Sequence, residues 1–265
     1  MGWNVGRPVE AHHPWPSQEG EQQTSQGKPH VKICIPHFGN VSMEWARCML
    51  EPLDVLAHPN FDKQVIIDRG ILNLDTLRND LVQMALKDPR TTHILFVDTD
   101  VVVEQPKDPN EAIQILLNCN NAVASGLYRA KQREGFNYAA WVRHPSGGRG
   151  YIPIGSWESG NWIHVDVIGF GFVLLKRECF EKVPYPWFEW GEPTPSEDFV
   201  FCEKLNQVGI QVRVMTDVSC SSGTSFMILF SSNMVSHVLN ITSVVLPCWV
   251  TSLLTYSNPS MLEMK

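Results

Sequence analysis

The stretch that decides the fold is HILFVDTD, residues 93–100. Its first five residues are almost wholly apolar, which is typical of a central strand buried on both faces of a sheet. The strand stops abruptly at two carboxylates, Asp98 and Asp100. In open α/β sheets, ligands bind beyond the carboxyl ends of the strands, so we expect these side chains to point into a crevice there.

Short apolar runs alternate with helix-period segments on both sides of this strand, which predicts a sheet covered by helices. Strand-like runs are expected at residues 31–36, 63–68, 122–126, 165–175 and 210–215. Helices are expected at residues 41–56, 74–84, 110–117, 177–182 and 196–208. The order predicts an α/β fold with a mostly parallel sheet flanked by helices.

The chain of 265 residues is expected to divide into three parts. Residues 1–30 are rich in Pro, Gln, Gly and His and lack the apolar core of a signal peptide, so they are expected to be a disordered leader. Residues 31–220 form the α/β domain, and residues 221–265 form an atypical uncharged tail. Window 234–254 is the best candidate for a membrane span, but its histidine, asparagine and proline argue against one.

Charge and cysteine content narrow the classes of partner and compartment. The net charge is -7, and the 21 Lys and Arg are scattered, so nucleic acid is not expected as a partner. The seven cysteines include no C-x-x-C pair and cannot all pair within one chain. Reduced thiols in a cytoplasmic protein are therefore expected. Peripheral association with a membrane stays open.

Asp98 and Asp100 are the first candidates for a metal site. Two carboxylates at one strand end repel each other unless a cation lies between them. Mg²⁺ or Mn²⁺ is commonly held by one or two carboxylates together with substrate phosphates. The alternative is that Asp100 caps a turn and Asp98 binds a neighbouring loop, and this short motif alone does not decide between the two.

A second acidic pair, Glu197 and Asp198, follows the breaker-rich run before the helix at 196–208. Acidic residues in a first turn are common for dipole and capping reasons, and Ser196 is a plausible N-cap. The pair gains interest from Gly169 and Gly171 upstream, where missing side chains would let a ligand approach the backbone. The glycines could equally mark a bulge.

Taken together, these motifs resemble a known family. The chain carries in order VKICIP, LDTLRNDLV, HILFVDTDVVV, VASGLYRA, VIGFGFVLLKRECFEKV with PWF, and SEDFVFCEKLNQVGIQV. This series resembles the GT-A glycosyltransferases, close to glycosyltransferase family 2, over residues 31–219. The resemblance implies a GT-A (Rossmann-like) fold with a nucleotide-binding half and an acceptor-binding half.

The resemblance also implies roles for individual residues. Asp98 and Asp100 match the family's D-x-D, in which the first carboxylate lies near the ribose and the last binds the metal. The remaining matches are, in chain order, Pro36 and His37 beside the nucleotide base, Arg78 and Asn79 facing the nucleotide, Gly169 and Gly171 under the donor sugar, Trp187 or Trp190 stacking on a sugar, and Glu197 with Asp198, whose Asp is the general base of inverting members.

The implied reaction is transfer of a hexosyl group from a nucleoside diphosphate sugar to a hydroxyl of a glycan, lipid or protein, with Mn²⁺ or Mg²⁺. A positioned carboxylate can accept the hydroxyl proton, and a metal can stabilise the departing diphosphate. One departure matters: the family usually supplies a metal-binding His shortly after the position of Asp217, and the next His here is His237.

Two other functions stay open on the sequence. Residues 98–102 also fit the D-x-D-x-[TV] motif of haloacid dehalogenase type phosphatases, where Asp98 would be a nucleophile. That family places the motif on its first strand, whereas two strand and helix units precede it here. The missing His also allows a degenerate transferase that binds a nucleotide or glycan without turnover.

Overall fold

The computed structural model describes residues 27–39, 41–55, 57–70, 73–128, 138–144, 151–154, 157, 160–191 and 196–222. Most of the expected leader and tail, and the candidate span at 234–254, lie outside these residues, so the domain limits stay predictions. Within the described ranges, no helix is long and apolar enough to cross a membrane.

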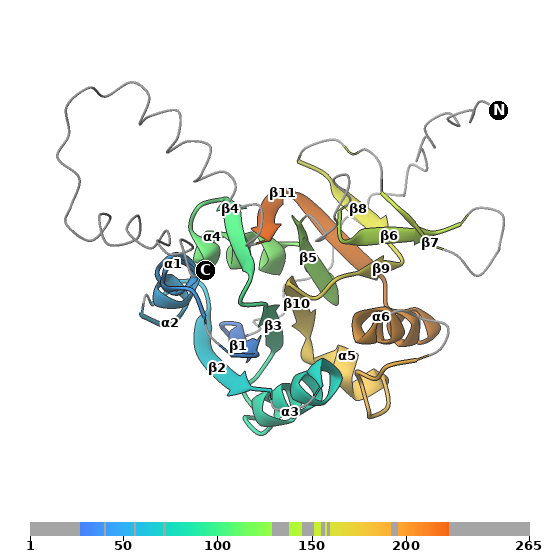
Figure 1. Ribbon diagram of the computed structural model, residues 1–265, viewed down its shortest axis with the longest axis horizontal. Coiled ribbons are helices and arrows are strands. Elements are labelled where there is room, and N and C mark those ends of the chain that lie inside the picture. Colours follow the sequence, from blue (N-terminus) through green and yellow to red (C-terminus); the bar gives the residue numbers. More distant parts are fainter. Residues whose placement is uncertain are drawn as a thin grey trace, which may run out of the picture.

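The centre of the fold is an eight-stranded mixed sheet (Figure 1). Seven strands follow the order β2-β1-β3-β10-β5-β11-β4, and β8 pairs with β11. Their bounds are β1 His30–His37, β2 Asp62–Arg69, β3 His93–Val97, β4 Val101–Gln105, β5 Val123–Tyr128, β8 Trp162–Val165, β10 Phe172–Lys176 and β11 Val212–Ser222.

Five of these strands run in one direction. Parallel pairs join β1 to β2, β1 to β3 and β5 to β11. Strand β10 runs antiparallel between β3 and β5, and β4 and β8 run antiparallel to β11. The predicted α/β class with a mixed, mostly parallel sheet is confirmed.

The apolar run at 165–175 does not form one continuous strand. It ends β8, forms β9 (Val167–Ile168) and then enters β10. Strand β9 belongs to a small second sheet with β6 (Ala140–Arg143) and β7 (Tyr151–Pro153). The amide of Gly169 donates to the carbonyl of Ala139 at 2.9 Å, which ties the glycine-rich stretch to this sheet.

Helices cover both faces of the main sheet (Figure 1). The expected helix at 41–56 is built from α1 (Met43–Trp45), the π-helical turn η1 (Ala46–Leu50) and α2 (Glu51–Val55). The others are α3 (Leu74–Leu86), α4 (Pro109–Asn118), α5 (Arg177–Lys182) and α6 (Glu197–Gln207). Helix α4 begins where Asp108 accepts a hydrogen bond from the Asn110 amide, with Pro109 in the first turn.

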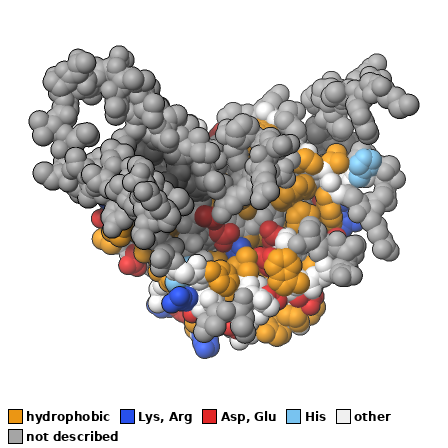
Figure 2. Space-filling view, in the orientation of Figure 1, with side chains coloured by type: hydrophobic (Ala, Val, Ile, Leu, Met, Phe, Trp, Pro, Cys, Tyr) orange, Lys and Arg blue, Asp and Glu red, His pale blue; other side chains and the backbone are white. Residues whose placement is uncertain are grey.

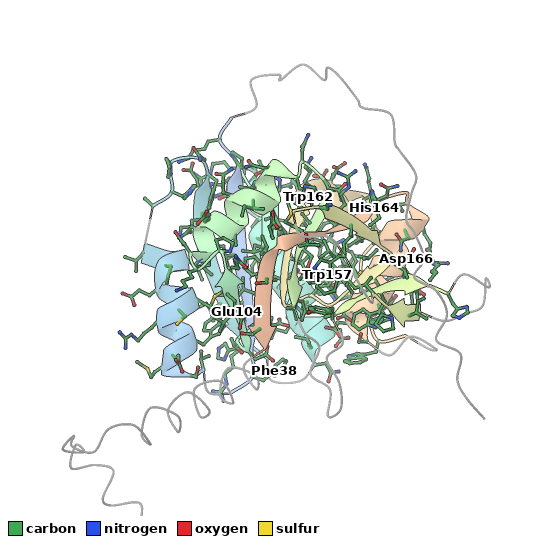
Figure 3. All side chains as sticks on the ribbon, turned by 90° about the horizontal axis from the view of Figure 1, so that it is seen from above. Phe38, Glu104, Trp157, Trp162, His164 and Asp166 are labelled. Atoms are coloured by element: carbon green, nitrogen blue, oxygen red, sulfur yellow. The ribbon has the colours of Figure 1, made fainter. Side chains whose placement is uncertain are left out.

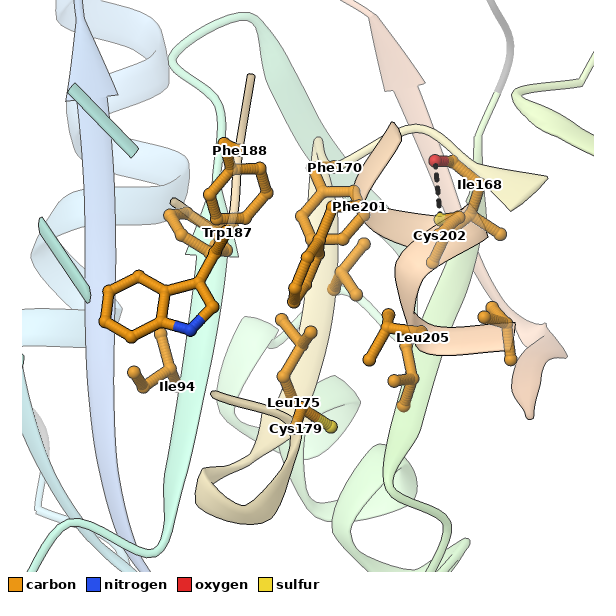
Figure 4. Packing of buried hydrophobic residues seen from close by; sticks show 14 of the residues in the cluster. Ile94, Ile168, Phe170, Leu175, Cys179, Trp187, Phe188, Phe201, Cys202 and Leu205 are labelled. Carbon is orange, nitrogen blue, oxygen red and sulfur yellow. Dashed lines mark hydrogen bonds between the residues drawn. The ribbon is translucent and has the colours of Figure 1, made fainter. Parts of the chain in front are cut away.

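The two cores follow from the alternation of side chains along buried strands. On β3, Leu95 and Val97 face the cluster under α1, α2 and α4, whereas Ile94 and Phe96 face the cluster under α3, α5 and α6. The second cluster is rich in phenylalanine: Phe170, Phe188 and Phe201 pack ring against ring (Figure 4). All six cysteines of the described residues are free thiols.

Candidate active site at the carboxyl ends of the strands

The turn that carries the D-x-D motif lies at the carboxyl end of β3. The amide of Asp98 donates to the carbonyl of Gly171 at 3.0 Å, and the amide of Val101 donates back to the carbonyl of Asp98 at 3.1 Å. The indole of Trp45, 3% exposed, donates to the carbonyl of Val101 at 2.9 Å. Backbone and indole bonds therefore hold the turn on both sides.

Arg78 on α3 joins the two acidic motifs. Its Nη2 donates to both carboxylate oxygens of Asp98, at 3.1 and 3.3 Å, and its Nε donates to Oε1 of Glu197 at 3.1 Å. Glu197 is the first residue of α6 and is 3% exposed. The structure thus brings the D-x-D motif and the acidic pair to one place.

Asp198, the other half of that pair, is partly buried beside Glu197. Burial, followed by the charge of Glu197, raises its pKa to about 6, although the Ser196 hydroxyl and Arg78 oppose the shift. Burial is also the main cause that raises the pKa of Asp98. Ionising these carboxylates is therefore costly without a further positive charge.

The charge balance of the site fits a cation. Asp98, Glu197 and Asp198 lie around one guanidinium, and Asp100 lies near Asp98. Acidic and basic side chains gather near the centre of the face in Figure 2. Among the described residues, no three His, Cys, Asp or Glu side chains are grouped so as to hold a metal ion by themselves. A cation would therefore take further ligands from a substrate, which is common for Mg²⁺.

The two glycines expected under a donor sugar have another neighbour. Gly169 and Gly171 are buried, and the ring of Tyr128 occupies the space that their side chains would need. The Tyr128 hydroxyl accepts a hydrogen bond from the Gly171 amide at 3.1 Å. The structure thus explains the missing side chains by Tyr128 and does not support close approach of a ligand.

Tyr128 itself is a site residue that the sequence did not single out. Burial raises the pKa of its phenol, and the charges of Asp98 and Asp198 raise it further. The phenol therefore lies near both acidic motifs. Its position at the end of β5, beside the strand that leads from the glycines, is the only signal that could have indicated it.

Asn79 is buried behind the site and holds a loop. Its Oδ1 accepts hydrogen bonds from the amides of Trp187 and Phe188, both at 3.1 Å, and its Nδ2 donates to the carbonyl of Phe188 at 2.7 Å. Because both ends of the amide bind backbone, the structure gives no support to the implied contact between Asn79 and the nucleotide.

The two candidate tryptophans lie in the same loop but differ in exposure. Trp187 is 8% exposed, and its indole donates to the carbonyls of Phe180 and Val183. Trp190 is 55% exposed. Trp187 is therefore a core residue, and only Trp190 can meet a sugar without unfolding the loop.

Pro36 and His37 end β1 at the same edge. Cys34 lies opposite Phe96, so Pro36 is level with Asp98 two residues further along. Pro36 is buried, and His37 is partly exposed with its Nδ1 at 3.3 Å from the Gly39 carbonyl. The next residue, Phe38, is 50% exposed and lies at the rim in Figure 3. His37 and Phe38 are the accessible residues here.

Comparison with known proteins places this fold among solved structures. No family model and no curated protein matches the sequence. The structure is similar to A197 from STIV, with a TM-score of 0.50 and 19% identity over 72% of this chain and 84% of that chain.

Two further structures are less similar. The structure of GalNAc-T7 with UDP, GalNAc and Mn²⁺ gives a TM-score of 0.49 and 12% identity over 74% of this chain and 44% of that one. A glycosyltransferase involved in glycosylation of the major capsid of PBCV-1 gives a TM-score of 0.41 and 17% identity over 71% of this chain and 83% of that one. The chain has a GT-A-like α/β fold.

Proposed function

We propose that the protein is a metal-dependent glycosyltransferase that moves a hexosyl group from a nucleoside diphosphate sugar to a hydroxyl of a glycan, lipid or protein. One observation carries the proposal: at the carboxyl edge of a GT-A-like sheet, a buried guanidinium joins a D-x-D carboxylate to the first residue of a second acidic pair. Ligands of open α/β sheets bind at this edge.

The D-x-D pair suits the donor end of the reaction. Asp100, together with Asp98, would hold Mn²⁺ or Mg²⁺, which when bound stabilises the negative charge of the diphosphate. Asp98 already accepts two hydrogen bonds from Arg78, so it would share its carboxylate between the guanidinium and the cation. The bonds that hold the D-x-D turn keep both carboxylates at the crevice.

Asp198 suits the role of general base. The acceptor hydroxyl loses its proton to the Asp198 carboxylate while its oxygen forms a bond to the anomeric carbon. The bond from that carbon to the diphosphate oxygen breaks, and the electron pair leaves with the diphosphate. A carboxyl pKa raised to about 6 is closer to neutrality than that of an ordinary aspartate, which improves proton transfer. Glu197 holds Arg78 beside it.

The accessible aromatic residues suit the two substrates. Phe38 and His37 at the end of β1 are proposed to contact the base, and Trp190 to contact the acceptor sugar. The free thiols of the described cysteines support a cytoplasmic location. The proposed reaction requires neither peripheral membrane association nor a nucleic acid partner.

The phosphatase alternative has less support from the structure. A nucleophilic Asp98 would need a carboxylate oxygen available for attack, whereas both oxygens accept hydrogen bonds from Arg78. The motif also follows β3, after two earlier strands of the sheet. A binding protein without turnover has no specific observation in its favour.

The test is release of nucleoside diphosphate from a panel of nucleotide sugars, with Mn²⁺ or with a chelator, and with p-nitrophenyl phosphate as a parallel substrate. We expect release of nucleoside diphosphate that depends on Mn²⁺ and on Asp198. We expect no hydrolysis of p-nitrophenyl phosphate. Glu104→Gln changes an exposed carboxylate on β4 and is the control. Binding of a nucleotide sugar without any turnover would contradict the proposal and indicate a protein that binds the nucleotide sugar without catalysis.

A further inference from the structure

Arg78 is the largest fully buried side chain among the described residues and carries a full charge. A buried charge is costly unless it is paired and hydrogen-bonded. Its partners, Asp98 and Glu197, belong to motifs that lie far apart in the chain. A side chain whose burial is costly in free energy thus connects the two motifs on which the proposed reaction depends.

The contacts of the guanidinium fix direction as well as distance. Nε donates to Glu197, and Nη2 donates to Asp98. Arginine presents these donors in a rigid plane, whereas lysine carries one compact ammonium on a flexible stem. Lys at this position could neutralise the same charge but could not hold both carboxylates in the same geometry.

Two aromatic rings hold the plane itself. The guanidinium carbon lies 5.1 Å from the ring centroid of Phe96 and 5.8 Å from that of Phe170. Cation–π contacts at these distances favour a fixed plane. The remaining nitrogen, Nη1, is buried and has no hydrogen-bond partner among the described residues. The two ion pairs and the two rings therefore fix the orientation of the guanidinium.

We propose that Arg78 is a positioning residue that fixes the D-x-D carboxylate Asp98 relative to the general-base pair Glu197 and Asp198. The inference rests on the proposed function and gives Arg78 a role in place of the nucleotide contact that family resemblance implies. Arg78 acts through these carboxylates and does not itself touch the reacting atoms.

The first test compares Arg78→Lys with the control Arg177→Lys, which alters an exposed pair with Glu181 on α5. Thermal unfolding, donor binding with Mn²⁺, and kcat and KM are measured for each. We expect Arg78→Lys to fold and to lose at least about tenfold in kcat, because small misplacements of reacting groups are costly. The donor KM should change much less, and Arg177→Lys should match the wild type.

A second readout separates positioning from general loss of structure. Asp198 is faced by Glu197 and Ser196 on its own segment, by Arg78 on α3 and by Tyr128 at the end of β5. Removing the cation with Arg78→Met should shift the acidic limb of the kcat profile to higher pH. A limb that stays in place would show that Arg78 does not act on Asp198.

Phe170→Leu is the variant for the case in which neither substitution of Arg78 folds. It removes a ring beneath the guanidinium and keeps the charge, and we expect kcat to fall severalfold with little change in KM. Wild-type kcat in Arg78→Lys, or an unchanged kcat in folded Phe170→Leu, would overturn the inference alone. A wild-type protein that binds and turns over no nucleotide sugar would overturn the proposed function and this inference with it.

Discussion

The hydroxyl of Tyr128 accepts a hydrogen bond from the amide of Gly171 at 3.1 Å, directly behind the D-x-D turn. A Cβ at Gly171 would lie 2.8 Å from Cγ2 of Val101 and 3.0 Å from Cζ of Tyr128. A Cβ at Gly169 would overlap the Tyr128 hydroxyl itself. The glycine-rich stretch and the tyrosine therefore fit together as one packed unit.

Gly169→Ala is expected to destabilise the protein by about 1–3 kcal/mol, the usual cost of overpacking. Combining it with Tyr128→Phe should make the alanine substitution less costly, because the overlapping hydroxyl is gone. Chemical unfolding of the four proteins of this cycle measures the coupling. Gly27→Ala, where a Cβ meets nothing within 4 Å, is the control. Strictly additive effects would contradict the packing.

Asn79→Ala should loosen the loop that carries Trp190. The substitution leaves two backbone amides and one carbonyl without their side-chain partner, and an unsatisfied buried group costs about 1–3 kcal/mol. Hydrogen exchange at the amides of Trp187 and Phe188 should accelerate. Gln114→Ala, which removes a half-buried amide that donates only to the side chain of Asn118, serves as the control. Unchanged protection of both amides would show that the loop does not depend on Asn79.

The two tryptophans of that loop should separate stability from acceptor use. Trp187→Ala is expected to cost about 3–5 kcal/mol because the side chain is buried in the core. Trp190→Ala should change stability by no more than about 0.5 kcal/mol. If Trp190 contacts the acceptor, its loss raises the acceptor KM and leaves the donor KM unchanged. The opposite pattern would exclude Trp190 from the acceptor site.

Asp198 should also make stability depend on pH. Its pKa is raised from 3.8 to about 6 in the folded protein, so between these values the folded state binds a proton that the unfolded chain has released. The resulting stability is present below about pH 4 and is lost as the pH rises toward 6.

Asp198→Asn cannot ionise, so its stability advantage over the wild type should grow from near zero below pH 4 to about 3 kcal/mol above pH 6. Unfolding free energies at several pH values measure this difference. Activity should be lost in the same variant. A difference that is independent of pH would show that Asp198 ionises normally in the folded protein.

The sequence predicted most of the sheet because its signals are local. Residues 93–97 form an apolar run that can be buried on both faces only as a central strand, and β3 lies there. Parallel strand ends share one edge, so the crevice with Asp98 was predictable as well.

Other parts depend on contacts that no local pattern shows. Strand β4 pairs with the end of β11, Val212–Ser222. The same strand β11 also pairs with β5, with a shift of register between Met215 and Ser219. The burial of Arg78 was equally hidden, since an arginine on a helix is normally solvated and only tertiary contacts supply its two carboxylates.

The neighbour of the two glycines was hidden for the same reason, and their expected place under a donor sugar stays a prediction. A glycine signals that something approaches the backbone, but it does not say what approaches. Here the neighbour is Tyr128, which comes from a strand far earlier in the chain. The roles expected from the resemblance for Pro36 and His37 stay predictions, because their contacts within the chain do not decide them.

The most direct test of the central claim is calorimetric titration of nucleoside diphosphate sugars into the wild type and Asp100→Asn, each with and without Mn²⁺. Glu104→Gln is carried through the same titrations as the control. The proposed function predicts that one donor binds to the wild type and to the control only with Mn²⁺, and that this binding is lost in Asp100→Asn. Binding that ignores both the metal and Asp100, or no binding of any donor, would contradict a metal-dependent glycosyltransferase.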